Sequence, residues 1–201
     1  MIWIATVAGS LVLAEFYGYW LHVLLHSYWV PSLSRGHMNH HILSYGPGQR
    51  QRSEEYIQDL AEGDVVIAGV GLEWLIPSAV LLVFTVIVEW AMGMSWTQIA
   101  VSLLTVLAYT IFLFWWLHDR MHVSDHHLLR NRWTRKAFLR SRKLHDIHHH
   151  HVTDDGLMNR NYGIAFFVFD RLFGTFLPTL KDGLNDGGVR NAERLLKKHS
   201  K

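Results

Sequence analysis

The sequence predicts an all-α integral membrane protein with about three transmembrane helices and a cytosolic helical cap that carries clustered histidines. Three apolar runs, at about residues 2–26, 65–94 and 96–117, are long enough to cross the hydrocarbon core of a bilayer. Fifteen histidines occur among 201 residues, and most of them gather between and after these runs. These observations favour a single membrane domain over residues 1–201 that holds the histidines at a membrane surface.

The composition narrows the possible chemistry. Half of the residues are apolar, and the sequence contains no cysteine. The lack of cysteine excludes disulfides, thiolate metal ligands, iron–sulfur clusters and a catalytic cysteine within these residues. A net charge of only +2 gives no general case for nucleic acid as a partner, so we expect none.

The first apolar run, residues 2–21, contains a single charge, Glu15. A secretory signal peptide is the competing interpretation of such a segment. No basic residue precedes Arg35 and no clear small-x-small cleavage site follows the run, so we predict a retained helix. This helix is expected to continue to His26.

The second and third runs predict a transmembrane hairpin joined by a tight connection at residues 93–95. The second run is interrupted by Glu73, Pro77 and Glu89, and we expect it to cross with tilt or with a kink at Pro77. The third run carries no charge and delivers His118 to the membrane surface. It ends in aromatic residues typical of a membrane interface: Phe112, Phe114, Trp115 and Trp116.

The basic residues predict the orientation of the chain. All nineteen lysines and arginines lie within residues 27–64 and 118–201, whereas the N-terminus and the 93–95 connection have none. The positive-inside rule therefore places the metal-site region, residues 27–64 and 118–180, in the cytoplasm. We expect a multi-pass protein of a bacterial inner membrane or of the endoplasmic reticulum.

Three further segments lie outside the three apolar runs. Residues 53–60 are expected to form a short helix with acidic residues in its first turn. Residues 164–180 are apolar and aromatic but contain Asp170 and Arg171, so an amphipathic segment on the membrane or over the site fits better than a span. The polar tail from Lys181 is predicted to fray.

The histidines repeat two spacings that place side chains on one face of a helix. Residues three and four apart share a face, so each cluster aims two or three imidazoles at one point. Ten imidazole nitrogens are too many for one ion, whereas two ions with about five nitrogens each fit the count. The four clusters are His22 and His26; His37, His40 and His41; His118 and His122; and His145, His148 and His149.

Polar residues beside the clusters could orient the imidazoles from behind. These candidates are Asp119, Asp125, Asp146, His126 and His127. Ordinary surface charge on a helix is an equal alternative for the three aspartates. Whether His126, His127, His150 or His151 bind metal stays open, and no catalytic residue beyond the metal ligands is predicted.

The order of these motifs resembles the fatty acid hydroxylase/sterol desaturase superfamily. The chain reads HVLLH, HMNHH, a hydrophobic hairpin, HDRMH and HDIHHHH, followed by NRNYG and FDRLFGT. The similarity covers about residues 15–178. It implies a membrane helical scaffold and a non-haem centre of two iron ions, held by the ten histidines of the four clusters, with no haem or flavin in the chain.

The resemblance also implies an O2-dependent oxidoreductase. Such an enzyme hydroxylates or desaturates an unactivated C–H position of a lipid substrate from the bilayer, a fatty acyl chain or a sterol- or hopanoid-like molecule. Electrons are expected from a separate cytochrome b5-type or ferredoxin-type donor, and membrane lipids are the surrounding partners. The substrate, and the choice between hydroxylation and desaturation, stay open.

Two alternatives remain. Bacterial carotenoid hydroxylases, of the kind that act on beta-carotene, are similar in size and box order, but their last histidine pair is usually spaced differently. A histidine-rich membrane metal-binding or transport protein would need ligands at mid-membrane to form a path. The apolar runs of this sequence are almost free of such ligands.

Overall fold

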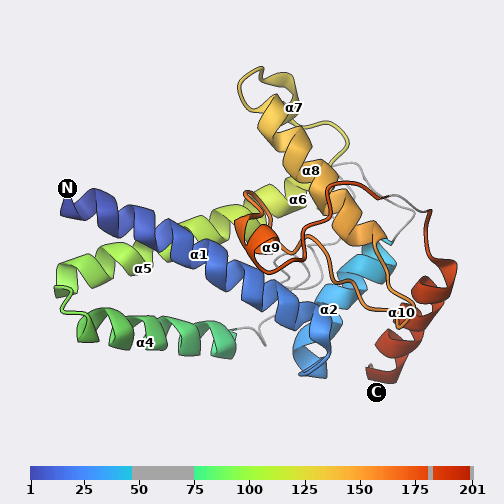
Figure 1. Ribbon diagram of the computed structural model, residues 1–201, viewed down its shortest axis with the longest axis horizontal. Coiled ribbons are helices and arrows are strands. Elements are labelled where there is room, and N and C mark those ends of the chain that lie inside the picture. The colour runs from blue at the N-terminus through green and yellow to red at the C-terminus, as the bar shows by residue number, and fades with distance from the viewer. Residues whose placement is uncertain (47–74, 181–182, 200–201) are drawn as a thin grey trace.

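The computed structural model describes residues 1–46, 75–180 and 183–199 of the chain. These residues form helices joined by turns and loops, which confirms the all-α prediction for this part of the chain (Figure 1). The predicted helix at 53–60, and the beginning of the second apolar run, lie outside it. In chain order the helices are α1 (Ile2–Ser27), α2 (Pro31–Asn39), the π-helix η1 (His40–Ser44), α4 (Leu75–Ala91), α5 (Trp96–Thr110), the π-helix η3 (Ile111–Leu117), α6 (His118–Met121), α7 (His127–Arg130), α8 (Arg135–His150), α9 (Val168–Leu172) and α10 (Asp186–His199).

Three apolar helices, α1, α4 and α5, extend to one side of the molecule (Figure 1). Helix α1 and the continuous helix Trp96–Met121 are long and apolar enough to cross a membrane, and α4 contributes a shorter apolar helix. Large apolar side chains such as Ile4, Val83 and Leu104 are exposed on their outer faces. Exposed apolar surface of this extent is favourable against lipid rather than water.

The hairpin between α4 and α5 has the tight connection that the sequence predicts. Gly93 adopts a φ of 81°, a left-handed conformation that glycine adopts at little cost. Ser95 then caps α5, because its hydroxyl accepts a hydrogen bond from the backbone N–H of Gln98 while the Gln98 side chain accepts from the backbone N–H of Ser95. The two helices therefore run antiparallel.

Polar side chains join the apolar helices where they pack together. The hydroxyl of Ser10 lies 2.8 Å from that of Ser102, which donates to Glu89 Oε1 at 2.6 Å. Closer to the histidines along both helices, the hydroxyl of Tyr109 donates to Glu15 Oε1 at 2.7 Å. Each contact gives a partner to a polar group that lipid could not satisfy.

We expect Tyr109→Phe to destabilise the helix packing by about 1–2 kcal/mol, because the Glu15 carboxyl group loses its hydroxyl donor. The matched control is Tyr17→Phe, which removes a neutral hydroxyl contact to Thr85 Oγ1 at 2.9 Å. Such contacts average about 0.6 kcal/mol within membranes. Thermal unfolding in detergent should therefore give the larger loss for Tyr109→Phe, and equal melting temperatures for both variants would contradict this.

The C-terminal tail forms a helix, so the prediction that it frays is wrong. Helix α10 spans Asp186–His199 and packs against α2 (Figure 1). Its Ala192 and Leu196 are buried in one cluster with Met38 and Ile42. The tail has a short apolar stripe at positions four apart among many charged residues. Its role can be recognised only when the helix that it packs against is known.

The segment 164–180 contains only one short helix, α9, which lies against α1. Phe166, Val168 and Leu172 are exposed on it, whereas Asp170 is fully buried. These three apolar side chains therefore face outward, whereas Ile164, Phe167 and the one acid face the protein.

Candidate metal centre

Two helical segments in the N-terminal part of the chain present the first five histidines. His22 and His26 lie one turn apart near the end of α1. The remaining three extend from α2 into η1: His37, His40 and His41.

The structure places nine of the ten candidate histidines in two groups. The first histidine group contains His22, His26, His37, His41 and His148, and the second contains His40, His118, His122 and His149. Within each group one nitrogen of every ring lies within 4.8 Å of those of the others. All of these side chains are buried.

Neighbouring histidines go to different groups, which the spacing alone did not predict. His40 and His41 are separated between the groups, and so are His148 and His149. Successive residues of a helix are rotated by about 100°, so adjacent side chains cannot aim at one point. Each adjacent pair therefore spans two sites, and the rings of His41 and His149 stack between them with centroids 3.8 Å apart.

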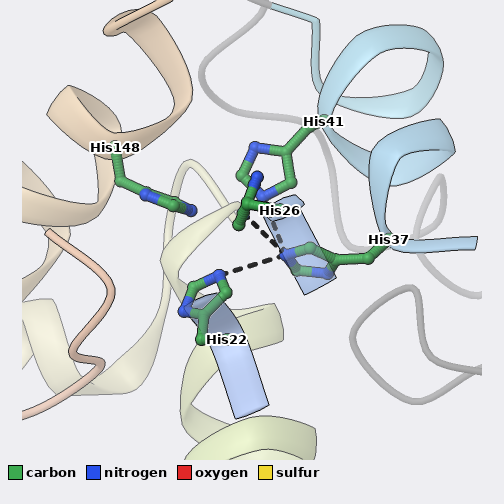
Figure 2. A group of neighbouring side chains, drawn as sticks. All are labelled: His22, His26, His37, His41 and His148. Carbon is green, nitrogen blue, oxygen red and sulfur yellow. Dashed lines mark hydrogen bonds between the residues drawn. The ribbon is translucent and has the colours of Figure 1, made fainter. Parts of the chain in front are cut away.

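His37 is at the centre of the first group (Figure 2). Its Nε2 lies 3.0 Å from Nε2 of His22 and 3.1 Å from Nε2 of both His26 and His41. A ring nitrogen carries at most one hydrogen, so these three contacts cannot all be hydrogen bonds. An ion with nitrogen ligands at about 2.1 Å instead requires that neighbouring ligand nitrogens lie about 3.0 Å apart.

His145 adjoins the second group. Its Nε2 lies 3.1 Å from Nε2 of His122, and its ring centroid is 4.7 Å from that of His118 and 4.6 Å from that of His149. With His145 included, each group offers five imidazoles.

Backbone carbonyl groups orient several of these rings. A carbonyl oxygen can only accept, so the ring nitrogen facing it must carry the hydrogen, and the other nitrogen is left with a lone pair directed at the group. Three histidines donate in this way from Nδ1: His22 to Tyr162 (2.5 Å), His148 to Arg160 (2.6 Å) and His149 to Tyr45 (3.2 Å).

The sequence predicts side chains in the orienting role and gives no direct sign of these carbonyl groups. Every residue has a carbonyl group, so no residue type marks it. The one available signal is the NRNYG motif, because Arg160 and Tyr162 both belong to it.

Of the candidate orienting aspartates, Asp119 has the contact that the role requires, because its Oδ1 lies 3.2 Å from Nδ1 of His118. Asp125 instead pairs with Arg130 at 2.5 Å, and both side chains are exposed. The Arg130 guanidinium holds the pKa of the Asp125 carboxyl below its usual value.

The remaining candidates lie outside both groups. Asp146 offers its backbone oxygen to Nδ1 of His150 at 2.8 Å. The ring of His126 packs on Trp116, and the exposed His127 lies beside both.

The environment keeps five of the imidazoles neutral. Burial, reinforced by the neighbouring rings, lowers the pKa far below its ordinary value in these five: His40, His41, His145, His148 and His149. A neutral ring keeps the lone pair that a metal needs.

Buried ring nitrogens without a hydrogen-bond partner indicate that the two groups could each hold a metal ion. Nε2 is buried without a hydrogen-bond partner in four histidines: His40, His118, His148 and His149. A buried polar atom without a partner is costly. A divalent transition metal in each group would satisfy these atoms, and imidazole suits iron, zinc, copper and nickel. The donor set therefore fits two such ions.

Comparisons with known proteins agree with a centre of this kind. A family model described as "Fatty acid hydroxylase" matches residues 7–175, more than half of the chain, including the ten histidines of the four clusters. Searches of curated proteins and of solved structures found no match.

Proposed function

We propose, because the chain belongs to the fatty acid hydroxylase family, that it is a membrane-bound diiron oxygenase. It would hydroxylate or desaturate an unactivated C–H position of a lipid, with O2 and electrons from a separate donor. The observation that carries this proposal is the pair of buried, all-imidazole groups at the end of two helices long enough to cross a membrane.

The two groups would each hold one iron. His37 and the four histidines around it would bind the first ion, and His145 would join the second group at the other. Bound iron would supply the activation of O2 that an unreactive C–H bond demands. The chain would hold the rings in one tautomer and exclude water by burial.

The substrate would enter from the bilayer beside a small cavity of about 10 Å³, which must widen to admit a lipid. The cavity lies between α1 and η3, one helical turn before His22, and Gly18, Phe114 and Tyr162 are among the residues that line it. The space depends on Gly18, because a Cβ atom there would lie 2.9 Å from Cε2 of Phe114. Lipid that moved between these helices would approach the first histidine group directly.

We expect Gly18→Leu to lower product formation by about tenfold or more, because a side chain there fills the cavity and displaces Phe114. The bound iron should stay unchanged. Gly9→Leu is the matched control on the same helix, since nothing lies within 4 Å of a Cβ atom at Gly9. Turnover by purified protein in lipid nanodiscs, with iron content measured on the same samples, checks this. Equal activity of both variants would argue against the cavity as the route.

The charge distribution supports a cytoplasmic location of the histidine groups. Exposed basic residues, including Arg132, Arg135 and Lys136, occupy α8 and the turn before it, and Trp133 between them is 79% exposed. Such a surface suits the headgroup region of the inner leaflet. In this orientation a soluble or membrane-bound electron donor reaches the site from the cytoplasm.

Purification with metal analysis and a lipid assay tests the function. We expect about two irons per chain, as the two-group donor set suggests, and lipid oxidation that requires both O2 and a reductase system. The His127→Ala variant should match the unmodified protein, because this exposed ring lies outside both groups. Stoichiometric zinc alone, with no turnover when a competent reductase is present, would count against the proposal.

A further inference from the structure

We propose that Asp170 is a positioning residue for the first histidine group and acts on His22 through the peptide unit between Tyr162 and Gly163. The inference rests on the proposed function, in that the first group must bind a metal ion. It concerns how this chain fixes and tunes one of its ligands from a carboxylate that touches no histidine.

The side chain of Asp170 is fully buried and has three hydrogen-bond donors. Oδ1 accepts from the backbone N–H of Tyr162 at 2.7 Å and from the hydroxyl of Thr175 at 2.8 Å. Oδ2 accepts from the backbone N–H of Gly163 at 2.8 Å. The carboxylate thereby holds two successive peptide units in fixed orientations.

The second of these peptide units connects the carboxylate to the metal ligand. In a planar trans peptide the N–H and the C=O point in opposite directions. The N–H of Gly163 points at Asp170, so the C=O of Tyr162 points away from it, toward Nδ1 of His22 at 2.5 Å. The carboxylate, the peptide and the imidazole form one chain of hydrogen bonds.

This chain of hydrogen bonds fixes the position of the imidazole and also changes its electronic properties. A carboxylate at one end polarises the peptide, and a polarised carbonyl oxygen accepts more strongly from the ring beyond it. When a strong acceptor holds the Nδ1–H of a histidine, its Nε2 gives its lone pair to a metal ion more readily. Asp170 would thus act on the ligand as a directly bonded carboxylate does, with a peptide unit interposed.

The same segment aims the carbonyl that holds His148. The N–H of Asn161 donates to the backbone oxygen of Thr175 at 3.1 Å, and this N–H shares a peptide unit with the C=O of Arg160, which accepts from Nδ1 of His148 at 2.6 Å. Thr175 itself is held by Asp170. Two ligands of the first group therefore depend on the segment from Asp170 to Thr175.

The local sequence supports this arrangement. A Cβ atom at Gly163 would lie 2.7 Å from Oδ2 of Asp170, so only glycine permits the close approach of the carboxylate. Asn161 has a φ of 56°, and its side-chain amide donates to the backbone oxygen of Leu144 at 3.1 Å, which anchors the loop on α8. The NRNYG motif and the FD pair of the sequence meet here.

The test is metal affinity of the full-length protein in detergent, measured with Co²⁺ against a competing chelator and by the visible absorption of bound Co²⁺. Asp170→Asn keeps the size of the side chain but removes its charge. We expect it to weaken binding at the first group by about 10- to 100-fold and to shift the absorption of that site. The second group should bind as in the unmodified protein.

A double-mutant cycle separates positioning from a general structural role. Asp170→Asn should cause a much smaller loss of affinity in a His22→Ala background, because only its indirect effect on His148 through Thr175 then remains. Ile99→Ala, which removes a buried apolar side chain near the start of α5 and far from the histidines, serves as a control of comparable destabilisation and should leave the Co²⁺ spectrum unchanged. Additive losses, or equal weakening of both groups, would overturn the inference.

A milder variant applies if Asp170→Asn does not fold. Thr175→Val removes one donor to Asp170 Oδ1 and should weaken the first group by about two- to fivefold, with a smaller spectral shift in the same direction. No change in affinity or spectrum would again overturn the inference. If the unmodified protein binds no Co²⁺ at the first group, the proposed function itself fails.

Discussion

The His37→Ala variant is expected to lose the metal of the first histidine group and all measurable lipid oxidation. Nε2 of His37 is 3.0–3.1 Å from a nitrogen of each of His22, His26 and His41, so its removal opens the group at the centre. The second group does not include this ring and should keep its ion. Iron per chain should fall from about two to about one, in line with the two donor sets.

The comparison that sharpens this prediction is His40→Ala, three residues along the same segment. His40 belongs to the second group, so its loss should empty the other site and leave the first filled. Mass spectrometry of bound metal, combined with X-ray absorption of the iron that remains, distinguishes the two half-filled proteins. Two irons per chain in His37→Ala, or identical spectra for both variants, would contradict the division into groups.

The Gly156→Ala variant is expected to lower the stability of the folded cap by about 2–4 kcal/mol. Gly156 has a φ of 84°, and a left-handed conformation costs an L-residue about 1–2 kcal/mol. In addition, the new Cβ atom would lie 2.5 Å from the backbone nitrogen of Ala192, which forces α10 away from the loop it covers.

Gly174→Ala isolates the conformational part of this effect. Gly174 also has a positive φ, 76°, but nothing lies within 4 Å of a Cβ atom there. Thermal unfolding in detergent should therefore show a clearly larger loss for Gly156→Ala. Equal losses in the two variants would mean that the close approach of α10 contributes nothing to stability.

The sequence predicts the scaffold well, because its signals are local. Apolar runs of the required length, a Gly-Met-Ser connection and histidines at helical spacing are each visible within a few residues. The predicted first run, 2–26, corresponds to α1, and the third, 96–117, ends at the helix that carries His118. The start of the second run lies outside the described residues, so the expectation of three spans stays a prediction.

The division of the histidines could not be predicted, because it depends on where whole helices lie. The spacing of His37, His40 and His41 suggests a common target, and on a single helix that is a fair inference. Two targets become possible only when α8 approaches from the other side and offers His148 to one and His149 to the other.

The groups that orient the histidines could not be predicted from the sequence either. The three carbonyl groups that receive Nδ1–H belong to Tyr45, Arg160 and Tyr162, and a carbonyl leaves no mark in a sequence. Asp170 looked like a membrane-surface charge because it follows apolar residues. Its burial, and its contacts with the loop before it, required the fold.

The first histidine group joins residue 22 to residue 148, so its ligands are separated by most of the polypeptide. During synthesis, the early histidines leave the ribosome long before their partners exist. Neither group is complete until residue 149 has been made. The full donor set of each group therefore assembles only late in synthesis, and a chain truncated ahead of residue 148 would leave both groups incomplete.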